Sequence, residues 1–283
     1  MKIIYSPKCL EYQQTGHPES PERVGKVYDF LRANFDFLQP ERCSAEDILR
    51  VHAKGFLSKV ESSDFYDDDT PSLPGMYDFA KLAAGAAMLA AKTSFAGESA
   101  FSLMRPPGHH AGKDFLGGFC YFNNMAIAIR FAQEKLGVKN VLLLDIDCHH
   151  GNGTQDIFLG DSNVRYVSLH QSPLYPGTGL ESQKNCFNFP LTAGTTGKEY
   201  LQVFEKALIS QQDFNPDLIG VSAGFDTYKD DPLTDMSLEQ QTYGEIGSMI
   251  SQLGAPVFTI LEGGYSRDMP SCVYEYLKGV SGI

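Results

Sequence analysis

Short apolar runs alternate with longer stretches of helical periodicity along most of the 283-residue chain, and this alternation limits the fold more than any other feature. Several runs are almost continuously apolar, which is typical of strands whose two faces are both covered by helices. The expected strands are Lys2–Tyr5, Ser99–Leu103, Val141–Asp147, Val164–Leu169, Leu218–Ala223 and Val257–Leu261. This order predicts an α/β fold with a mainly parallel sheet between two helical layers.

Helical spacing predicts five helices in the intervening segments. Ser20 and Pro21 have the residue types of a helix cap and a first turn, so a helix is expected to begin at Glu22. The other expected helices are Asp78–Lys92, Asn124–Lys135, Lys198–Gln212 and Leu238–Leu253. The segment 62–75 has the turn residues of a loop. Candidate site residues occur on both sides of this loop, so we expect one domain, residues 1–283.

Composition and charge exclude several classes of protein. The formal net charge of −12 argues against a nucleic-acid binder, because no basic surplus is present to neutralise phosphates. No run of about 18 apolar residues occurs, so no membrane span is expected. The N-terminal apolar stretch is too short for a signal-peptide core. The six cysteines contain no CxxC pair and are expected to be reduced. We therefore expect a cytoplasmic protein.

The densest group of polar residues is VLLLDIDCHHGNG, residues 141–153. In a continuing strand Asp145, Asp147 and His149 would face one way, while Cys148 would face the core. They follow a buried strand, where open parallel sheets place their ligand crevices. Carboxylate and imidazole donors favour zinc or another first-row metal ion. The alternative for an isolated pair of this kind is that Asp and His bond each other or cap a helix near Gly153.

Three more polar groups follow apolar runs in the same manner. RPPGHHAG contains His109 and His110, LIGVSAGFDTYKDDPL contains Asp226, and FTILEGGYS contains Tyr265. Taken singly, the histidines are equally well explained by a hydrogen-bonded turn, and the tyrosine by a side chain that covers a loop. Because the carboxyl ends of parallel strands lie at one edge of a sheet, all four groups are expected to converge there.

Six motifs together resemble the arginase-like histone deacetylase superfamily, in its class II, acetoin-utilisation and acetylpolyamine amidohydrolase branch. They are RPPGHHA, GFCYFNN, LDIDCHHGNGTQDIF, SLHQSPLYPGTG, AGFDTYKDDPL and LEGGYS. The matches run from His17 to Tyr265 in the family's order. The resemblance implies a single-domain arginase/deacetylase fold and a zinc-dependent amidohydrolase.

The resemblance also implies a set of metal ligands. Asp147, His149 and Asp226 match the three zinc ligands, which leave a fourth position open. A structural potassium ion is expected next to the zinc, at Asp145, Asp147, His149, Ser168 and Leu169. A two-manganese, arginase-type site is not supported, because His150 and Asn152 stand where more carboxylates would be needed. The sequence does not decide between zinc and iron.

The catalytic residues implied by the resemblance form two groups. His109 and His110 match the paired histidines of the family, with Asp145 and Asn152 as their respective partners. We expect His110 to act as general base and then as acid, and His109 to act mainly through its charge. Tyr265 matches the catalytic tyrosine and is expected to donate to the tetrahedral oxyanion. Asn152 in place of Asp is similar to class II members.

The remaining matches concern the substrate. Gly118, Phe119 and Tyr175 match the walls of a narrow channel, although the family usually has Phe at the last position. The other expected substrate-binding residues are Asp69 at the rim, Arg23 near the internal acetate pocket, and Leu233 beside the slot. In the acetylpolyamine branch the Leu233 position can carry an acidic gatekeeper, so we expect acyl-lysine in proteins or peptides to be the substrate.

Several alternatives remain open from the sequence. Asp67–Asp69 would also attract polycations, so an acetylpolyamine or another small molecule is the second substrate class. A catalytically weak acyl-lysine binding module is the alternative of another kind, and release of free acyl product would exclude it. A monomer is expected because no long insertion for dimer pairing is evident. The preferred acyl group is not given by the sequence.

Overall fold

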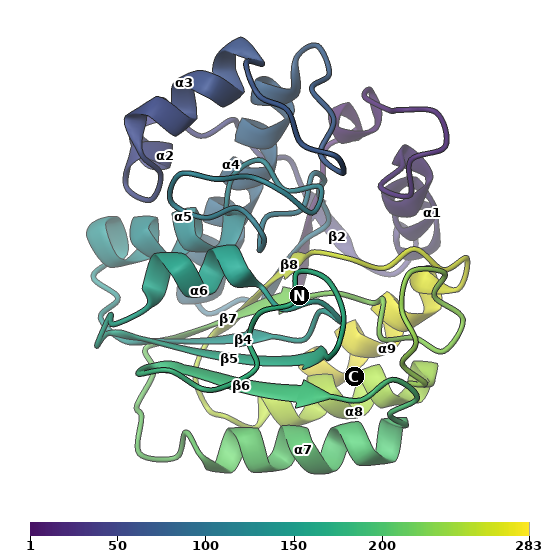
Figure 1. Ribbon diagram of the computed structural model, residues 1–283. Coiled ribbons are helices and arrows are strands. Elements are labelled where there is room, and N and C mark those ends of the chain that lie inside the picture. Colours follow the sequence, from purple (N-terminus) through teal and green to yellow (C-terminus); the bar gives the residue numbers. More distant parts are fainter. Residues whose placement is uncertain (283) are drawn as a thin grey trace.

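One parallel sheet of eight strands forms the centre of the protein, as a computed structural model of residues 1–282 shows (Figure 1). The strand order is β2-β1-β3-β8-β7-β4-β5-β6, and every neighbouring pair is parallel. The strands are β1 (Lys2–Ile4), β2 (Asp36–Leu38), β3 (Ala100–Ser102), β4 (Val141–Asp145), β5 (Val164–Gln171), β6 (Cys186–Leu191), β7 (Leu218–Ala223) and β8 (Val257–Leu261). The predicted α/β class is confirmed.

Helices cover both faces of this sheet (Figure 1). One layer consists of α1 (Pro21–Leu31), α7 (Gly197–Ile209), α8 (Gln240–Ser251) and α9 (Met269–Ser281). The opposite layer consists of α4 (Met76–Phe95), α5 (Asn124–Phe131), its π-helical continuation η2 (Ala132–Leu136), and α6 (Asn152–Phe158). Outside the α4 layer lie α2 (Ala45–Leu49) and α3 (Lys54–Ser62), and a short 3-10 turn, η1 (Pro7–Leu10), follows β1. The central strands are therefore buried on both sides, which explains their continuous apolar sequences.

The sequence pattern located the central strands better than the edge strands. The predicted bounds of β7 and β8 agree with the structure, whereas β2 and β6 at the two ends of the sheet were not predicted. Both edge strands are only partly buried and carry polar residues, so their apolar pattern is weak. The helices α2, α3, α6 and α9 were also missed. The predicted extension of β4 to Asp147 was wrong, because the strand ends at Asp145.

A buried histidine connects the outer helices to the loop that follows β3. The imidazole of His52, between α2 and α3, is only 3% exposed. Its Nδ1 lies 2.8 Å from the carbonyl oxygen of Gly112, and its Nε2 accepts the backbone N–H of Asn123 at 3.0 Å. Since the carbonyl can only accept and the amide can only donate, His52 is fixed as the neutral tautomer protonated at Nδ1. Burial lowers the pKa of His52 from 6.5 to about 4.

We predict that His52 makes the protein less stable in mild acid. The unfolded chain takes up this proton near pH 6.5 and the folded protein only near pH 4. The stabilisation is thus complete above pH 6.5 and is lost as the pH falls towards 4, by up to about 3 kcal/mol. In His52→Asn, which keeps a donor for Gly112, urea unfolding at pH 7 and pH 4.5 should show a smaller acid-induced loss. An equal loss in both proteins would contradict this role of His52.

Candidate active site

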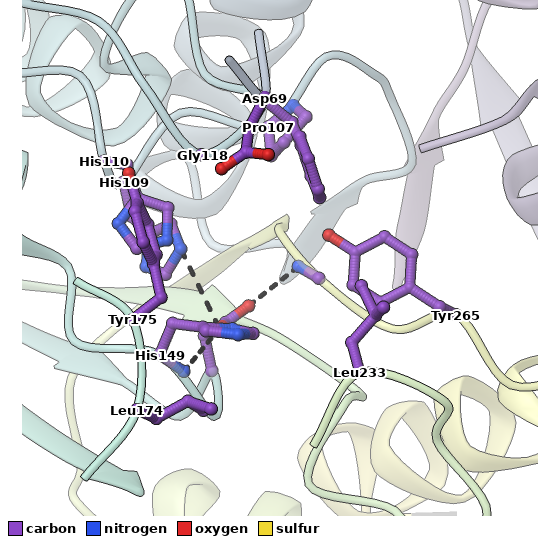
Figure 2. A pocket seen from close by; sticks show the side chains of 13 residues that line it. Asp69, Pro107, His109, His110, Gly118, His149, Leu174, Tyr175, Leu233 and Tyr265 are labelled. Carbon is purple, nitrogen blue, oxygen red and sulfur yellow. Dashed lines mark hydrogen bonds and ion pairs between the residues drawn. The ribbon is translucent and has the colours of Figure 1, made fainter. Parts of the chain in front are cut away.

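A cavity of about 220 Å³ opens at the carboxyl ends of the central strands (Figure 2). Its walls come from loops that follow β3, β4, β5, β7 and β8, and from the loop between α3 and α4. The residues that line it are Asp69, Pro107, His109, His110, Gly118, Phe119, Asp147, His149, Leu174, Tyr175, Leu233, Gly263 and Tyr265. Figure 2 shows the paired histidines on one side and the Tyr265 ring across the cavity from them.

Two carboxylates and one imidazole meet at the base of this cavity. Nδ1 of His149 lies 3.0 Å from Oδ1 of Asp147 and 3.0 Å from Oδ2 of Asp226. One ligand atom from each of the three residues lies within 4.8 Å of the others. Asp147 and Asp226 are buried, and His149 is partly buried on the cavity side. The three expected metal ligands, of which Asp226 was assigned from the resemblance alone, are therefore adjacent in space.

Backbone hydrogen bonds, not strand alternation, orient the two carboxylates. β4 has already ended when the chain reaches Asp147, whose Oδ1 accepts the N–H of His149 at 2.8 Å. Oδ2 of Asp147 accepts the N–H of Gly263 at 2.8 Å, and Oδ1 of Asp226 accepts the N–H of Cys148 at 2.9 Å. The predicted alternation along a continuing strand was thus wrong. The loop after β4 instead folds back onto itself and onto the loop after β8.

The chemistry of these three residues fits a zinc ion. Burial opposes protonation of His149, but its hydrogen bonds to Asp147 and Asp226 raise the pKa of its imidazole to about 10. A divalent cation satisfies the same two carboxylates and takes the place of that proton, because metals bind neutral imidazole. Two oxygen donors and one nitrogen donor also match the three protein ligands of catalytic zinc sites. Cys148 points away and contacts Gln171, so it is not a fourth ligand.

The paired histidines have different partners and different charges. Nδ1 of His109 lies 3.2 Å from Oδ2 of Asp145, and Nδ1 of His110 lies 2.8 Å from Oδ1 of Asn152. Burial opposes the charged form of His109, but Asp147 and Asp145 raise its pKa to about 10. Burial and the neighbouring imidazoles His109 and His149 lower the pKa of His110 well below 6.5. At neutral pH one imidazole is therefore charged and the other is neutral.

Two buried residues that sequence reasoning missed support this pair. The hydroxyl of Tyr166 on β5 donates to Oδ2 of Asp145 at 2.8 Å. Oε2 of Glu262 accepts the N–H of Gly108 at 2.7 Å and that of His109 at 3.2 Å. The sequence carries only weak signals for these roles. A tyrosine within a strand is ordinarily explained by packing, and a glutamate before two glycines by a turn. Their roles depend on contacts between segments that are distant in sequence.

Tyr265 follows the two glycines after β8, and Arg23 of α1 contacts both its ring and the loop before it. Nε of Arg23 donates to the carbonyl oxygen of Gly264 at 2.6 Å, and Nη2 donates to that of Glu262 at 2.7 Å. The guanidinium also lies 4.4 Å from the centre of the Tyr265 ring. Arg23 does not line the central cavity. It lines a separate cavity of about 200 Å³ that shares Tyr265 with it.

Aromatic and apolar side chains form the walls of the cavity. Phe119 packs edge-on to Tyr265 at 6.0 Å between ring centres, and Tyr175 lies 5.0 Å from the His110 ring on the opposite wall. Gly118 has φ +54°, and an added Cβ there would lie 2.3 Å from Cδ2 of His110. At the mouth, Tyr175 is 44% exposed and Leu233 is 37% exposed. The cavity therefore suits an extended alkyl chain.

The remaining predicted residues lie at the rim and behind the metal ligands. Asp69 lines the cavity, and its carbonyl oxygen lies 3.0 Å from Nε2 of His17. Ser168 and Leu169 are buried on β5, where Ser168 pairs with Asp145 of β4. The Ser168 hydroxyl lies 2.9 Å from Nδ1 of His170. Of the predicted potassium residues, Asp145, Ser168 and Leu169 thus lie on neighbouring strands, while Asp147 and His149 lie in the loop that follows β4.

Comparison with known proteins decides the family. The histone deacetylase domain profile matches residues 17–280. The chain belongs to the histone deacetylase family. A probable deacetylase of Methanothermobacter thermautotrophicus is 37% identical over 301 residues, which cover 100% of this chain and 91% of the relative. Acetylpolyamine amidohydrolase 2 of Pseudomonas aeruginosa is 32% identical over 317 residues, which cover 94% and 92% of the two chains.

The solved structures agree with this assignment. The crystal structure of the HDA15 HD domain superimposes with a TM-score of 0.94 at 30% identity, over 100% of this chain and 91% of that chain. Histone deacetylases are in general zinc-dependent, and this chain carries a candidate metal site and is a hydrolase of the deacetylase family. Among residues 1–282, no helix is both long and apolar enough to cross a membrane.

We predict that Gly263→Ala weakens metal binding although it replaces none of the three proposed ligands. An added Cβ would lie 2.4 Å from Oδ2 of Asp226 and 2.6 Å from Oδ2 of Asp147, so both carboxylates must move. The expected loss in zinc affinity, measured by chelator competition, is about tenfold or more. Gly55→Ala on α3 is the control, because its Cβ meets nothing within 4 Å. Unchanged zinc affinity in Gly263→Ala would contradict the prediction.

Proposed function

We propose that this deacetylase hydrolyses the amide of N-acyl-lysine in proteins or peptides, with zinc at Asp147, His149 and Asp226. One observation carries the proposal. The paired histidines and a tyrosine face one another across a narrow cavity with a candidate metal site of three residues at its base, and their surroundings favour a charged His109 and a neutral His110. This arrangement provides a base, a positive charge and an oxyanion donor around a single amide group.

His110 is the proposed general base. Its Nδ1 faces the acceptor oxygen of Asn152 and therefore carries a proton, which leaves Nε2 free to accept one. Zinc, when bound, supplies Lewis-acid polarisation of the amide carbonyl and of the attacking water. His110 takes the proton from that water and delivers it to the leaving amine. The charged His109, fixed by Asp145, stabilises the developing negative charge.

Tyr265 is the proposed oxyanion donor. Burial raises the pKa of its hydroxyl well above 10, so it stays protonated at neutral pH and is available to donate. A donor of this kind typically contributes about 2.7–4 kcal/mol to transition-state stabilisation. The ring lies across the cavity from the histidines, so its donor approaches the carbonyl oxygen from the side opposite the base (Figure 2).

The substrate class is inferred from the mouth of the cavity. Leu233 is apolar and half-exposed there, so it offers no partner for a second ammonium group of a polyamine. Phe119 and Tyr175 are suited to an uncharged alkyl chain, which the lysine side chain supplies after acylation. The rim residue Asp69 is available to the backbone amides of a peptide. These features together favour acyl-lysine.

Acetylpolyamine is the second candidate substrate. Relatives with that name cover almost the whole chain, and the consecutive aspartates Asp67–Asp69 lie in the loop that forms one side of the mouth. A polycation would be attracted to these carboxylates. The structural potassium ion, the single domain, the monomeric state and the cytoplasmic location remain predictions beside this proposal.

We predict that Tyr265→Phe lowers kcat by about two to three orders of magnitude and changes KM little, because the lost donor acts mainly in the transition state. Steady-state hydrolysis of an acetyl-lysine peptide measures both constants. Tyr274→Phe on α9, which does not line the cavity, is the control and should retain full activity. Retention of most activity in Tyr265→Phe would remove the oxyanion role.

We also predict a higher kcat/KM for an acetyl-lysine peptide than for acetylspermidine, because Leu233 cannot pair with a second ammonium group. Both substrates are compared at equal ionic strength, with longer acyl-lysine peptides in the same series. Asp226→Ala serves as the blank, since it lacks one of the three proposed ligands. A clear preference for acetylspermidine would reverse the assignment of substrate, and absence of any acyl release would favour a binding module.

A further inference from the structure

A buried carboxylate outside the proposed catalytic set joins two walls of the cavity. Asp231 lies in the loop after β7 and is only 6% exposed. Its Oδ1 accepts the N–H of Leu233 at 3.0 Å, and its Oδ2 accepts the N–H of Tyr265 at 2.7 Å. One side chain therefore ties the loop at the mouth of the cavity to the residue that carries the proposed oxyanion donor.

The two bonds require a carboxylate at this position. Both partners are backbone N–H groups, which can only donate, so the side chain must offer two acceptor atoms. An asparagine offers one acceptor oxygen, and its NH₂ group would face the other N–H. Burial is costly for this charge, and burial and Asp226 together raise the pKa of Asp231 to about 7.

The position of the Tyr265 hydroxyl depends on its backbone. A tyrosine side chain has only two rotatable bonds before its rigid ring, so a displaced backbone moves the hydroxyl. The carbonyl oxygen of Gly264 is held by Arg23, and the next N–H, that of Tyr265, is held by Asp231. This segment lies beyond the end of β8, and Gly264 has φ +116°, so the segment does not continue as a regular strand. Arg23 and Asp231 thus bind the carbonyl oxygen and the N–H of the same peptide group, between Gly264 and Tyr265.

We propose that Asp231 is a positioning residue that places the hydroxyl of Tyr265 for oxyanion stabilisation and links that placement to the Leu233 wall of the cavity. The inference rests on the proposed function of Tyr265. It differs from a general stabilising role, because it requires the effect of Asp231 on turnover to pass through the tyrosine hydroxyl. Its effect through Leu233 falls on substrate binding instead.

A double-mutant cycle separates these roles. Asp231→Asn is made with Tyr265 intact and in the Tyr265→Phe background, and kcat and KM are measured on an acetyl-lysine peptide. With Tyr265 intact, kcat should fall about 10- to 100-fold, because a small misplacement of a catalytic group has effects of this size. In the Tyr265→Phe background, kcat should change by less than about twofold. KM should change by a similar small factor in both.

The matched control is Asp235→Asn in the same loop. Oδ2 of Asp235 lies 3.4 Å from Nε2 of Gln171, and no hydrogen bond joins its side chain to Tyr265. This variant should leave kcat within about twofold of the parent protein. Thermal unfolding and zinc content are measured for every variant, so that loss of fold or metal is distinguished from loss of positioning.

Equal reduction of kcat in both Tyr265 backgrounds, or no reduction in either, would overturn the inference. If Asp231→Asn does not fold, Asp231→Glu gives the same test, because it keeps both acceptor oxygens but displaces them by one methylene. A crystal structure of the folded variant gives a readout that does not need turnover. Tyr265 should be displaced in it, and an unmoved Tyr265 would refute the role of Asp231. Absence of turnover in the parent protein would instead count against the proposed function.

Discussion

Buried negative charge at one edge of the sheet is the constraint on which the rest of this structure depends. Asp145, Asp147, Asp226, Asp231 and Glu262 all lie inside the protein near the same cavity. Unpaired, such carboxylates would cost several kcal/mol each. The structure compensates them with backbone N–H groups, with the charged imidazole of His109, and with a place for a cation beside His149. The loops after the strands are folded as they are because these oxygens must all be satisfied.

The central part of the fold and the three residues that meet at the candidate metal site could be predicted from the sequence, partly from local signals and, for Asp226, from the family resemblance. A strand buried on both faces is continuously apolar, and DxDxH directly after such a strand indicates a metal site when three further polar motifs follow neighbouring strands. Edge strands β2 and β6 left no comparable signal, since both are only partly buried and carry polar residues. The orientation of the Asp147 side chain could not be predicted either, because its Oδ2 is held by the N–H of Gly263, which lies 116 residues away in the sequence.

The supporting residues could not be found from sequence patterns for the same reason. Tyr166, Glu262 and Asp231 each form hydrogen bonds with segments that are distant in sequence, and each is locally an ordinary strand or turn residue. Arg23 was predicted near an internal acetate pocket from the resemblance, but its contacts with the loop before Tyr265 required coordinates. Asp145 and Asn152 were expected from the resemblance as partners of the paired histidines, whereas Tyr166, Glu262 and Asp231 emerge only from the tertiary structure.

The cavity combines a rigid floor with a more exposed mouth, and this division has a consequence for adaptation. Asp147, Asp226 and Gly263 at the floor are buried and mutually constrained, while Tyr175 and Leu233 at the mouth have much of their surface in solvent. Exchange of a side chain at the mouth therefore changes the entrance without replacing a residue of the floor. A lineage with this fold can acquire new substrates by drift at the entrance while the hydrolytic apparatus beneath stays unaltered.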